Sequence, residues 1–228
     1  EVNFIYHDRR PSGLVCHIQG PGEQLDLRLR GTAGQAHISA ALAAVAVGQI
    51  EGIGLPAAIG ALEALTWPPG RMKLLPGIKD TLIVDDSYNS SPVALEVALR
   101  GLQELVAYGR KIAVLGDMLE LGSFSVDEHR RMGTYAPACA DFLWTVGLRA
   151  QAMGAQAVEA GLSKKNVRHF ADAHAAGAAL AEWLREGDIA LIKGSQSMRM
   201  ERTVAQAMAH PEKKEKLLVR QEPEWRKK

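Results

Sequence analysis

Polar residues that could bind a ligand follow three apolar runs of the sequence. They form the segments DDSYNSSP (residues 85–92) after TLIV, GDMLELG (116–122) after KIAVL, and KGSQSMRME (193–201) after DIALI. In an open parallel sheet, ligands bind beyond the carboxyl ends of the strands, where helices begin. Binding or catalysis is therefore expected at these three segments.

The first segment has more polar side chains than a turn from a strand to a helix needs. Its SSP portion (90–92) fits a helix cap with a first-turn proline, and Asp85 would end the strand. Asp86, Tyr88 and Asn89 are then left without a role. A carboxylate can accept hydrogen bonds from both ribose hydroxyls, and an asparagine can pair with a purine edge. A capped turn and a nucleotide-binding loop both stay open.

The other two segments also admit structural interpretations. Asp117 and Glu120 could be general bases or metal ligands, but two acids without a nearby histidine or third carboxylate make a weak metal site. Helix capping and loop bonding are favoured for them. Lys193, followed by Gly194 and Ser195, could hold a carboxylate or phosphate at a helix start. A surface lysine before a serine-capped helix is an equal alternative.

Motifs for other chemistry are absent from the sequence. It contains no GxxxxGK[ST] phosphate-binding loop, no GxGxxG after the first strand, no GxSxG and no HExxH. The seven histidines show no spacing for a shared metal ion. No metal site is therefore predicted within this chain.

The elements that must position these segments change character at WPPGRM (67–72). Before it, VNFIYH, GLVCHIQ and LDLRLR alternate like antiparallel strands, and Ala-rich segments at about 35–48 and 56–66 predict helices. Two prolines and a glycine cannot continue a helix. We therefore expect a domain boundary here, between residues 1–70 and 71–228.

The sequence of residues 71–228 predicts an α/β fold. KLLPGIKDTLIVDD predicts a hairpin that enters a new sheet, and TLIVD, KIAVLGD, DFLWTVG, VRHF and DIALIKG are short apolar strands. Helical segments alternate with them, at about 91–107, 126–138, 148–161, 172–185 and 197–209. This alternation predicts a Rossmann-like, doubly wound and mostly parallel sheet with helices on both faces. The charge-rich tail predicts a solvated last helix or a fraying end.

Composition narrows the classes of partner. The 228 residues include 27 basic and 26 acidic ones, so no polyanion-binding surface, and no nucleic-acid partner, is expected. No apolar run reaches the ~18–20 residues of a membrane span. Cys16 and Cys139 lack a pairing pattern, which predicts reduced thiols in a cytoplasmic protein. Strand-like alternation begins at once without an initial Met, which suggests a piece of a longer chain.

The ordered set PGRM, DDSYNSSP, GDMLELG followed by His129, the VG of DFLWTVG, and KGSQSMRME resembles the Mur ligase family. Within that family, the set resembles the branch that adds D-alanyl-D-alanine to UDP-N-acetylmuramoyl-tripeptide. It covers essentially the whole chain and is strongest in 68–201. It implies a cytoplasmic, monomeric, ATP- and Mg-dependent amide ligase of peptidoglycan precursor synthesis. ATP would phosphorylate the tripeptide carboxylate, and the dipeptide amine would displace the phosphate.

The resemblance also implies roles for the two parts of the chain and for a nucleotide site. Residues 1–70 would end the central ATPase domain, and residues 71–228 would form the C-terminal domain. Arg71 matches the hinge arginine that reaches the nucleotide. Asp86 matches the acid that binds the ribose, with Tyr88 and Asn89 on the nucleotide side.

On the substrate side, Lys193 and Ser195 match the loop that faces the incoming substrate. Lys193 is the one candidate for a catalytic role. Asp117, Glu120 and His129 match family positions for which locking of loops is the preferred role.

Two departures from the family pattern matter. The family's phosphate-binding loop and magnesium ligands would precede residue 1, so this chain alone is expected to be inactive. The family's GxHNxxNALAA helix start is GQAHISAALAA here (34–44), with Ala36, His37 and Ala40 at the His, Asn and Asn positions. The second Asn contacts adenine in the family. Adenine recognition is therefore either relaxed or taken over by a neighbouring side chain.

Two other functions stay possible from the sequence. One is a non-catalytic α/β module that binds a nucleotide or a dipeptide. The other is a related Mur or folylpolyglutamate ligase with a different acceptor. DDSYN and KGSQSMRME favour the branch that adds D-alanyl-D-alanine.

Overall fold

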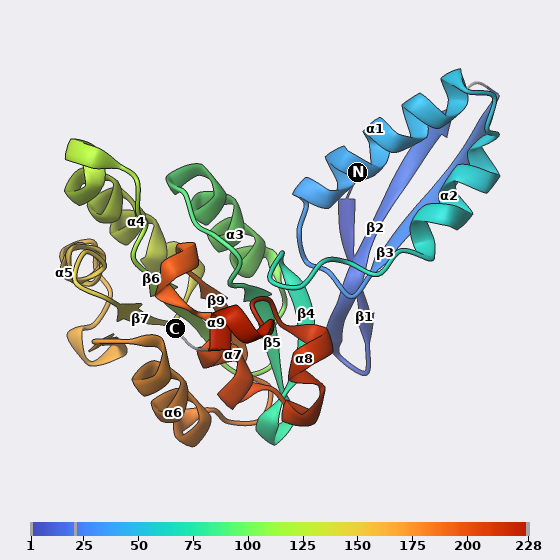
Figure 1. The fold of residues 1–228 in the computed structure, drawn as a ribbon. Helices are drawn as coiled ribbons and strands as arrows, with labels where there is room; N and C mark the ends of the chain where they lie inside the picture. The colour runs from blue at the N-terminus through green and yellow to red at the C-terminus, as the bar shows by residue number, and fades with distance from the viewer. Residues whose placement is uncertain (1, 21, 227–228) are drawn as a thin grey trace.

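A small antiparallel sheet with two helices forms the first unit of the chain. The structure, a computed structural model, describes residues 2–20 and 22–226. The strands run in the order β1-β2-β3: β1 (Val2–His7), β2 (Arg10–Gly20) and β3 (Glu23–Arg30). Helices α1 (Ala36–Ile50) and α2 (Leu55–Glu63) pack on one face of this sheet (Figure 1). Every second residue of β2 from Leu14 to Ile18 is buried there, which is the period of a strand with one covered face.

A six-stranded sheet forms the centre of the second unit, in the order β4-β5-β9-β6-β7-β8. Its strands are β4 (Lys73–Gly77), β5 (Thr81–Asp86), β6 (Lys111–Gly116), β7 (Phe142–Val146), β8 (Val167–Phe170) and β9 (Ile189–Lys193). Strand β4 is antiparallel to β5, and the remaining pairs are parallel. The predicted mostly parallel α/β sheet is confirmed.

Helices cover both faces of this sheet (Figure 1). One face carries α3 (Pro92–Glu104), α4 (Ser125–Cys139) and α5 (Gln151–Glu159), and the other carries α6 (Ala173–Trp183) and α7 (Glu201–Ala207). Leu82 and Val84 of β5 pack under the first layer, while Ile83 between them packs under the second. Strands β6 and β9 alternate in the same way. Burial on both faces explains why these strands are apolar throughout.

The tail contains α8 (Lys214–Leu217) and α9 (Pro223–Arg226). Residues 211–216 are exposed, as expected for a charge-rich segment. The prediction of a solvated or fraying end is wrong for the next turn, because Leu218 and Arg220 are buried. Leu218 joins the core beneath α6 and α7. These buried residues, with Leu217 packed beside them, hold this part of the charge-rich tail on the core.

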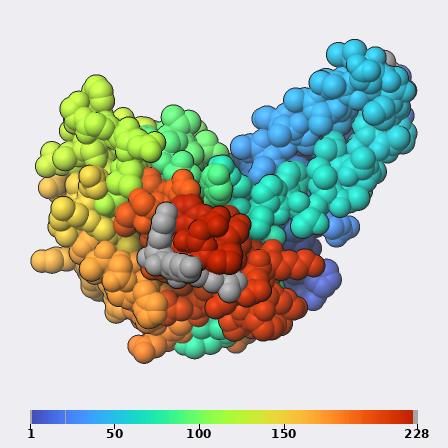
Figure 2. Space-filling view, viewed as in Figure 1, coloured from blue at the N-terminus to red at the C-terminus, as the bar shows by residue number. Residues whose placement is uncertain are grey.

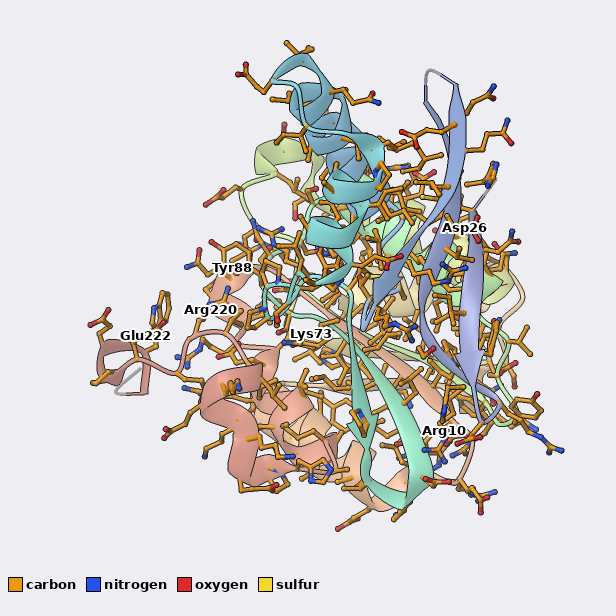
Figure 3. All side chains as sticks on the ribbon, turned by 90° about the vertical axis from the view of Figure 1, so that its right-hand side faces the viewer. Arg10, Asp26, Lys73, Tyr88, Arg220 and Glu222 are labelled. Carbon is orange, nitrogen blue, oxygen red and sulfur yellow. The ribbon has the colours of Figure 1, made fainter. Side chains whose placement is uncertain are left out.

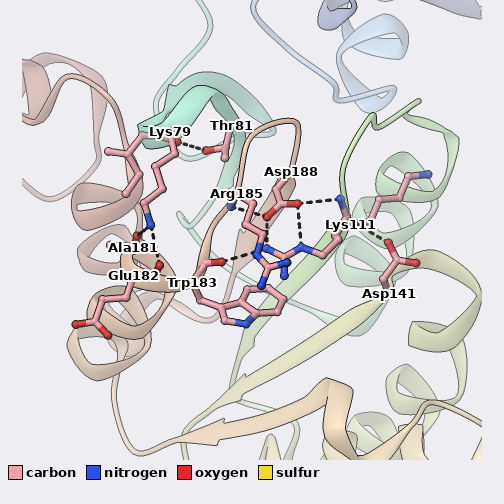
Figure 4. Close-up of polar contacts among 11 residues, drawn as sticks. Lys79, Thr81, Lys111, Asp141, Ala181, Glu182, Trp183, Arg185 and Asp188 are labelled. Carbon is pink, nitrogen blue, oxygen red and sulfur yellow. Dashed lines mark hydrogen bonds and ion pairs between the residues drawn. The ribbon is translucent and has the colours of Figure 1, made fainter.

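The amino-terminal ends of the strands carry a separate polar network (Figure 4). The buried carboxylate of Asp188 accepts hydrogen bonds from the Arg110 side chain and from the backbone N–H groups of Arg110 and Arg185. Lys79 donates to the carbonyls of Ala181 and Glu182 at the end of α6. This network joins the starts of β6 and β9 to the end of α6. It lies at the edge of the sheet opposite the carboxyl ends of the strands, where ligands are expected.

The first unit projects from the β4 edge of the second one, as Figures 1 and 2 show. Backbone bonds join them at the crossing: Ala33 N–H donates to the Met72 carbonyl over 3.0 Å, and Leu74 N–H donates to the Gly31 carbonyl over 3.0 Å. The β1–β2 hairpin touches the other end of the sheet, where Val106 N–H donates to the Tyr6 hydroxyl. Among the described residues, no helix is both long and apolar enough to span a membrane.

Asp85 holds the loop between the units to the end of β5. Its buried carboxylate accepts hydrogen bonds from Gly70 N–H and Ser87 N–H, each over 3.1 Å. Gly70 has φ +69°, and a Cβ there would lie 2.9 Å from the Tyr88 nitrogen, so glycine is required. Burial raises the pKa of Asp85 to about 6.

Replacing Asp85 with Asn tests this buried carboxyl, because it keeps the side-chain size and removes the titration. The pKa of Asp85 in the fold lies above the ordinary 3.8, so the native state binds the proton more tightly than the unfolded state. The native protein should therefore lose stability, relative to Asp85→Asn, as the pH rises from about 4 through 6. Over this pH range, the unfolding free energy of the native protein should fall by about 3 kcal/mol relative to that of Asp85→Asn.

Urea unfolding of both proteins between pH 4 and pH 7.5 measures this change. Titrating groups that do not interact with Asp85 cancel in the difference between the two unfolding free energies, which therefore reports Asp85 and its neighbour Asp86. A difference that does not vary with pH would mean that Asp85 keeps an ordinary pKa in the fold.

Candidate functional site

The three polar segments lie side by side at the carboxyl edge of the second sheet. This follows from the strand order, since β9 lies between β5 and β6. The register places Asp86 of β5 opposite Lys193 of β9, and Leu115 of β6 on the other side of Lys193. A parallel sheet thereby gathers residues that are far apart in the sequence.

Asp86 and Lys193 form a buried ion pair. Lys193 Nζ lies 2.6 Å from Asp86 Oδ2 and donates a second hydrogen bond to the Asn89 carbonyl over 2.8 Å. Asp86 Oδ1 accepts from Met72 N–H over 3.1 Å. The two residues are 6% and 3% exposed. Burial raises the pKa of Asp86, and the Lys193 ammonium opposes that effect.

This pairing differs from the arrangement that the resemblance implies. There, Asp86 faces a nucleotide and Lys193 faces an incoming substrate. Here each neutralises the other, and Lys193 also supports the backbone at Asn89. Ionised groups removed from water need such partners, because an isolated buried charge is very unfavourable.

Arg71 and Tyr88 stack at the surface above this pair. The guanidinium of Arg71 lies 4.1 Å from the centre of the Tyr88 ring, and that tyrosine is 41% exposed. Tyr88 N–H donates to the Gly70 carbonyl over 3.1 Å. The stack therefore joins the loop between the units to the loop after β5.

A cavity of about 560 Å³, here called the inter-unit cavity, lies between the start of α1 and helix α3. Its lining combines charged and apolar groups: residues 33–37, Arg71, Met72, Asp86, Ser91, Val93, Ala94, Val97, Ala98, Gly101 and Lys193. Three of the predicted site residues, Arg71, Asp86 and Lys193, thus line one cavity. Tyr88 and Asn89 are not part of its lining.

His37 borders the inter-unit cavity at the position of a family asparagine. Its Nδ1 lies 2.8 Å from the Thr32 hydroxyl, and its ring stacks on Trp67 with centres 4.3 Å apart. Burial, together with the charge of Arg71, lowers the pKa of His37 and favours a neutral ring. Ala36 also lines the cavity, whereas Ala40 does not.

A second cavity of about 730 Å³, here called the strand-end cavity, opens beyond β5, β6 and β9. It is lined by residues 89–91, 119–121, 195–197, Arg199 and Trp225. Ser195 accepts a hydrogen bond from Leu119 N–H over 2.8 Å and donates to the Ser90 carbonyl. Asn89, predicted for the nucleotide side, lines this cavity instead. Ser91 lines both cavities, so they adjoin at the start of α3.

Asp117 and His129 fix loops around the strand-end cavity. Asp117 Oδ1 accepts from Ala150 N–H over 2.7 Å, just before α5. His129 Nε2 accepts from Met118 N–H, so its Nδ1 carries the proton and donates to the Ser125 carbonyl. Both therefore have the structural role that the sequence favoured.

Glu120, by contrast, is exposed at the cavity and has φ +63°. Within the described part of the chain, no group of His, Cys, Asp and Glu residues could hold a metal ion.

Sequence reasoning missed Arg220, whose guanidinium donates to the carbonyls of Ser87 and Tyr88. It comes from the tail segment VRQEPEWRKK, where no periodicity marks one basic residue as buried. The stacking of His37 on Trp67 was also missed, since it depends on how the loop 64–72 folds back over α1.

Comparisons with known proteins agree with this architecture. Residues 70–196 match the profile of the Mur ligase, glutamate ligase domain. UDP-N-acetylmuramoyl-tripeptide–D-alanyl-D-alanine ligase of Bacillus subtilis is 31% identical over 182 residues, 78% of this chain and 39% of the relative. The enzyme of that name from Escherichia coli is 32% identical over 195 residues, 84% of this chain and 41% of the relative.

Solved structures show the same fold. MurF from Acinetobacter baumannii superposes with a TM-score of 0.73 at 26% identity, over 90% of this chain and 43% of that one. MurF ligase from Thermotoga maritima, solved in complex with ADP, superposes with a TM-score of 0.73 at 24% identity, over 90% of this chain and 44% of that one.

The chain spans about two fifths of the length of the curated relatives that it matches. The family profile covers the six-stranded sheet from the loop before β4 to the turn after β9, which includes the first two polar segments and residues 193–196 of the third. By this match, and by the ordered strands and loops that carry it, the chain belongs to the Mur ligase family.

Proposed function

We propose that this chain is the C-terminal part of an ATP-dependent ligase that joins D-alanyl-D-alanine to UDP-N-acetylmuramoyl-tripeptide in the cytoplasm. Residues 1–70 would complete its central domain, and residues 71–228 would be its C-terminal domain. The observation that carries the proposal is the pair of adjoining cavities at the carboxyl edge of the sheet. Two neighbouring cavities suit a reaction in which a group activated by a nucleotide meets a second substrate. The names of the curated relatives supply the substrates.

The inter-unit cavity is the proposed nucleotide site. Its apolar walls on α1 and α3 suit a base, and its polar end carries Arg71, Asp86 and Lys193. Each oxygen of Asp86 accepts one hydrogen bond in the structure and has capacity for another, from a ribose hydroxyl. Arg71 would meet the negative charge of the nucleotide. His37, neutral and held by Thr32 and Trp67, is the side chain that would border the base in place of asparagine.

The strand-end cavity is the proposed site of the incoming dipeptide. Ser195 and Asn89 border it, and the buried hydroxyl of Ser90 has no hydrogen-bond partner among the described residues. Glu120 brings an exposed negative charge to the lining, whereas the charge of Arg199 is already paired with Glu201 over 2.6 Å. A zwitterion such as D-alanyl-D-alanine has an ammonium that would pair with Glu120.

In the proposed reaction, the terminal carboxylate of the tripeptide takes the γ-phosphoryl group of ATP, and ADP is released. The dipeptide nitrogen then attacks the acyl carbon, and the bond to phosphate breaks. The residues of this chain would hold the two reactants at the start of α3 and exclude water from them. Because the described residues offer no ligand cluster for magnesium, we assign the Mg²⁺ of the reaction to other parts of the ligase.

The decisive experiment is a phosphate-release assay on the full ligase that contains this chain. Release should require ATP, Mg²⁺, UDP-N-acetylmuramoyl-tripeptide and D-alanyl-D-alanine together, and mass spectrometry should find the ligated pentapeptide product. The chain of residues 1–228 alone should release none, since it has no GxxxxGK[ST] loop. Strong turnover by this chain alone, or ligation of another amino acid in preference, would contradict the proposal.

Substitutions in the ion pair separate its structural role from nucleotide binding. Asp86→Ala should raise the KM for ATP about ten- to hundredfold, the equivalent of one hydrogen bond to a charged group. It should also destabilise the protein, because Lys193 is left buried without its partner. ATP titrations and thermal unfolding of the full ligase measure the two effects.

The double variant Asp86→Ala with Lys193→Met supplies the control. Removal of the orphaned ammonium should recover much of the stability and leave the KM for ATP high. If the KM for ATP recovers together with the stability, then Asp86 serves the fold and does not contact the nucleotide.

A bulky residue in the strand-end cavity tests the dipeptide site. Gln196 is exposed on the cavity lining, so Gln196→Trp should obstruct the space with little effect on the fold. The KM for D-alanyl-D-alanine should rise at least about tenfold, and the KM for ATP should stay within about twofold. Lys165→Trp, exposed at the opposite edge of the sheet, is the matched control. Equal effects on both substrates would count against the assignment of this cavity.

A further inference from the structure

Arg220 is a buried cation in the charge-rich tail of the chain. It is 6% exposed, and Leu218, two residues earlier, is anchored in the core beneath α6 and α7. The Arg220 backbone has φ +58°, a conformation that is unfavourable for a residue with a side chain. The fold thus keeps this side chain inside at some energetic cost, which calls for a compensating set of contacts.

The guanidinium of Arg220 connects three parts of the second unit. One nitrogen, Nη1, donates to the Ser87 carbonyl over 3.2 Å and to Glu201 Oε2 over 3.2 Å. The other, Nη2, donates to the Tyr88 carbonyl. Glu201 is itself buried at the start of α7. Figure 3 shows Arg220 beside Tyr88, with Glu222 farther out along the tail.

The bonds to Ser87 and Tyr88 are made to consecutive carbonyls just beyond the end of β5, where no strand partner is available. Two successive carbonyls that accept from one planar guanidinium must point toward the same side. That requirement sets the orientation of the peptide between them. A lysine ammonium, a point charge on a flexible stem, would not impose it.

The same loop is held on its other side by the segment between the units. Tyr88 N–H donates to the Gly70 carbonyl, and the Tyr88 ring lies 4.1 Å from the Arg71 guanidinium and 5.4 Å from that of Arg220. Val219 packs closely on Gly70, where a Cβ would lie 3.0 Å from its methyl carbon. Tail, loop and inter-unit segment therefore form one continuous set of contacts.

We propose that Arg220 is a positioning residue, which holds the loop 86–89 in the conformation that presents Asp86 and Arg71 to the inter-unit cavity. The positioning of the loop follows from the contacts of this chain alone. Its consequence for nucleotide affinity rests on the proposed function.

The first test is amide hydrogen exchange on the chain of residues 1–228 and on its Arg220→Lys variant. The variant keeps the positive charge and loses the planar guanidinium that donates to both carbonyls. Exchange at the Tyr88 amide should become at least about tenfold faster, while the amides of β6 and β9 keep their protection. Lys213→Gln, which changes an exposed charge in the same tail, should leave the Tyr88 amide as it is. Unchanged exchange in Arg220→Lys would overturn the proposal.

The second test is steady-state kinetics of the full ligase. Arg220→Lys should raise the KM for ATP at least about tenfold and leave the KM for D-alanyl-D-alanine within about twofold. Leu143→Ala creates a cavity in β7, on the face of the sheet opposite the Leu218 anchor, and controls for lost stability. If Leu143→Ala raises the KM for ATP as much as Arg220→Lys does, then Arg220 serves only stability, and the proposal fails.

The two tests distinguish the failure of this inference from that of the proposed function. A ligase without ATP-dependent activity would refute the function, while faster exchange at Tyr88 would still establish the positioning of the loop. Normal exchange in an active ligase would refute the positioning and leave the function intact.

Discussion

The ion pair between Asp86 and Lys193 is the interaction on which the candidate site depends. Removing both charges from water costs free energy. Their mutual attraction offsets this cost only when their remaining hydrogen-bond donors and acceptors also have partners. Here Met72 N–H and the Asn89 carbonyl are such partners, each from a different loop. The pair therefore connects two adjacent strands, the inter-unit segment and the loop before α3. Loss of either charge would leave the other one buried among groups that cannot neutralise it.

The contacts of the loops around this pair follow from its position at the carboxyl edge of the sheet. Strand β9 enters between β5 and β6, so the segments after all three strands must share one edge. Asp85, adjacent to Asp86, faces the other way and binds Gly70 N–H, which brings the inter-unit segment against the same loop. The two neighbouring carboxylates have separate partners, because one meets an ammonium while the other meets backbone N–H groups. Asp85 thus holds the segment between the units, while Asp86 holds the neighbouring strand β9 through Lys193.

Local patterns in the sequence predicted most of the fold. Apolar runs such as KIAVL and DIALI indicated buried strands, and Ser91 with Pro92 indicated the start of α3, where the Ser91 side chain accepts from Ala94 N–H. The site was predicted less completely, because its contacts cross between distant segments. The partner of Asp86 is set by strand order and register, neither of which is encoded next to residue 86. Arg220 looks in sequence like any other tail arginine, and its burial goes with the packing of Leu218 and with its own bonds to Ser87 and Tyr88.

The joint between the two units has strong and weak parts, and their distribution matters for the inter-unit cavity. At the crossing, the bonds of residues 31–33 with 72–74 and of Asp85 with Gly70 are backbone or buried interactions. Away from the crossing, the contacts include the exposed ion pair of Arg10 with Asp80, the hydrogen bond of Val106 with Tyr6, and the hydrogen bond between Gln35 and Glu104. Exposed pairs of this kind contribute little, on the order of 0–1 kcal/mol. The joint thus depends mainly on the crossing, where Met72 N–H also donates to Asp86, so the firmly held part of the joint is the part that carries the Asp86–Lys193 pair.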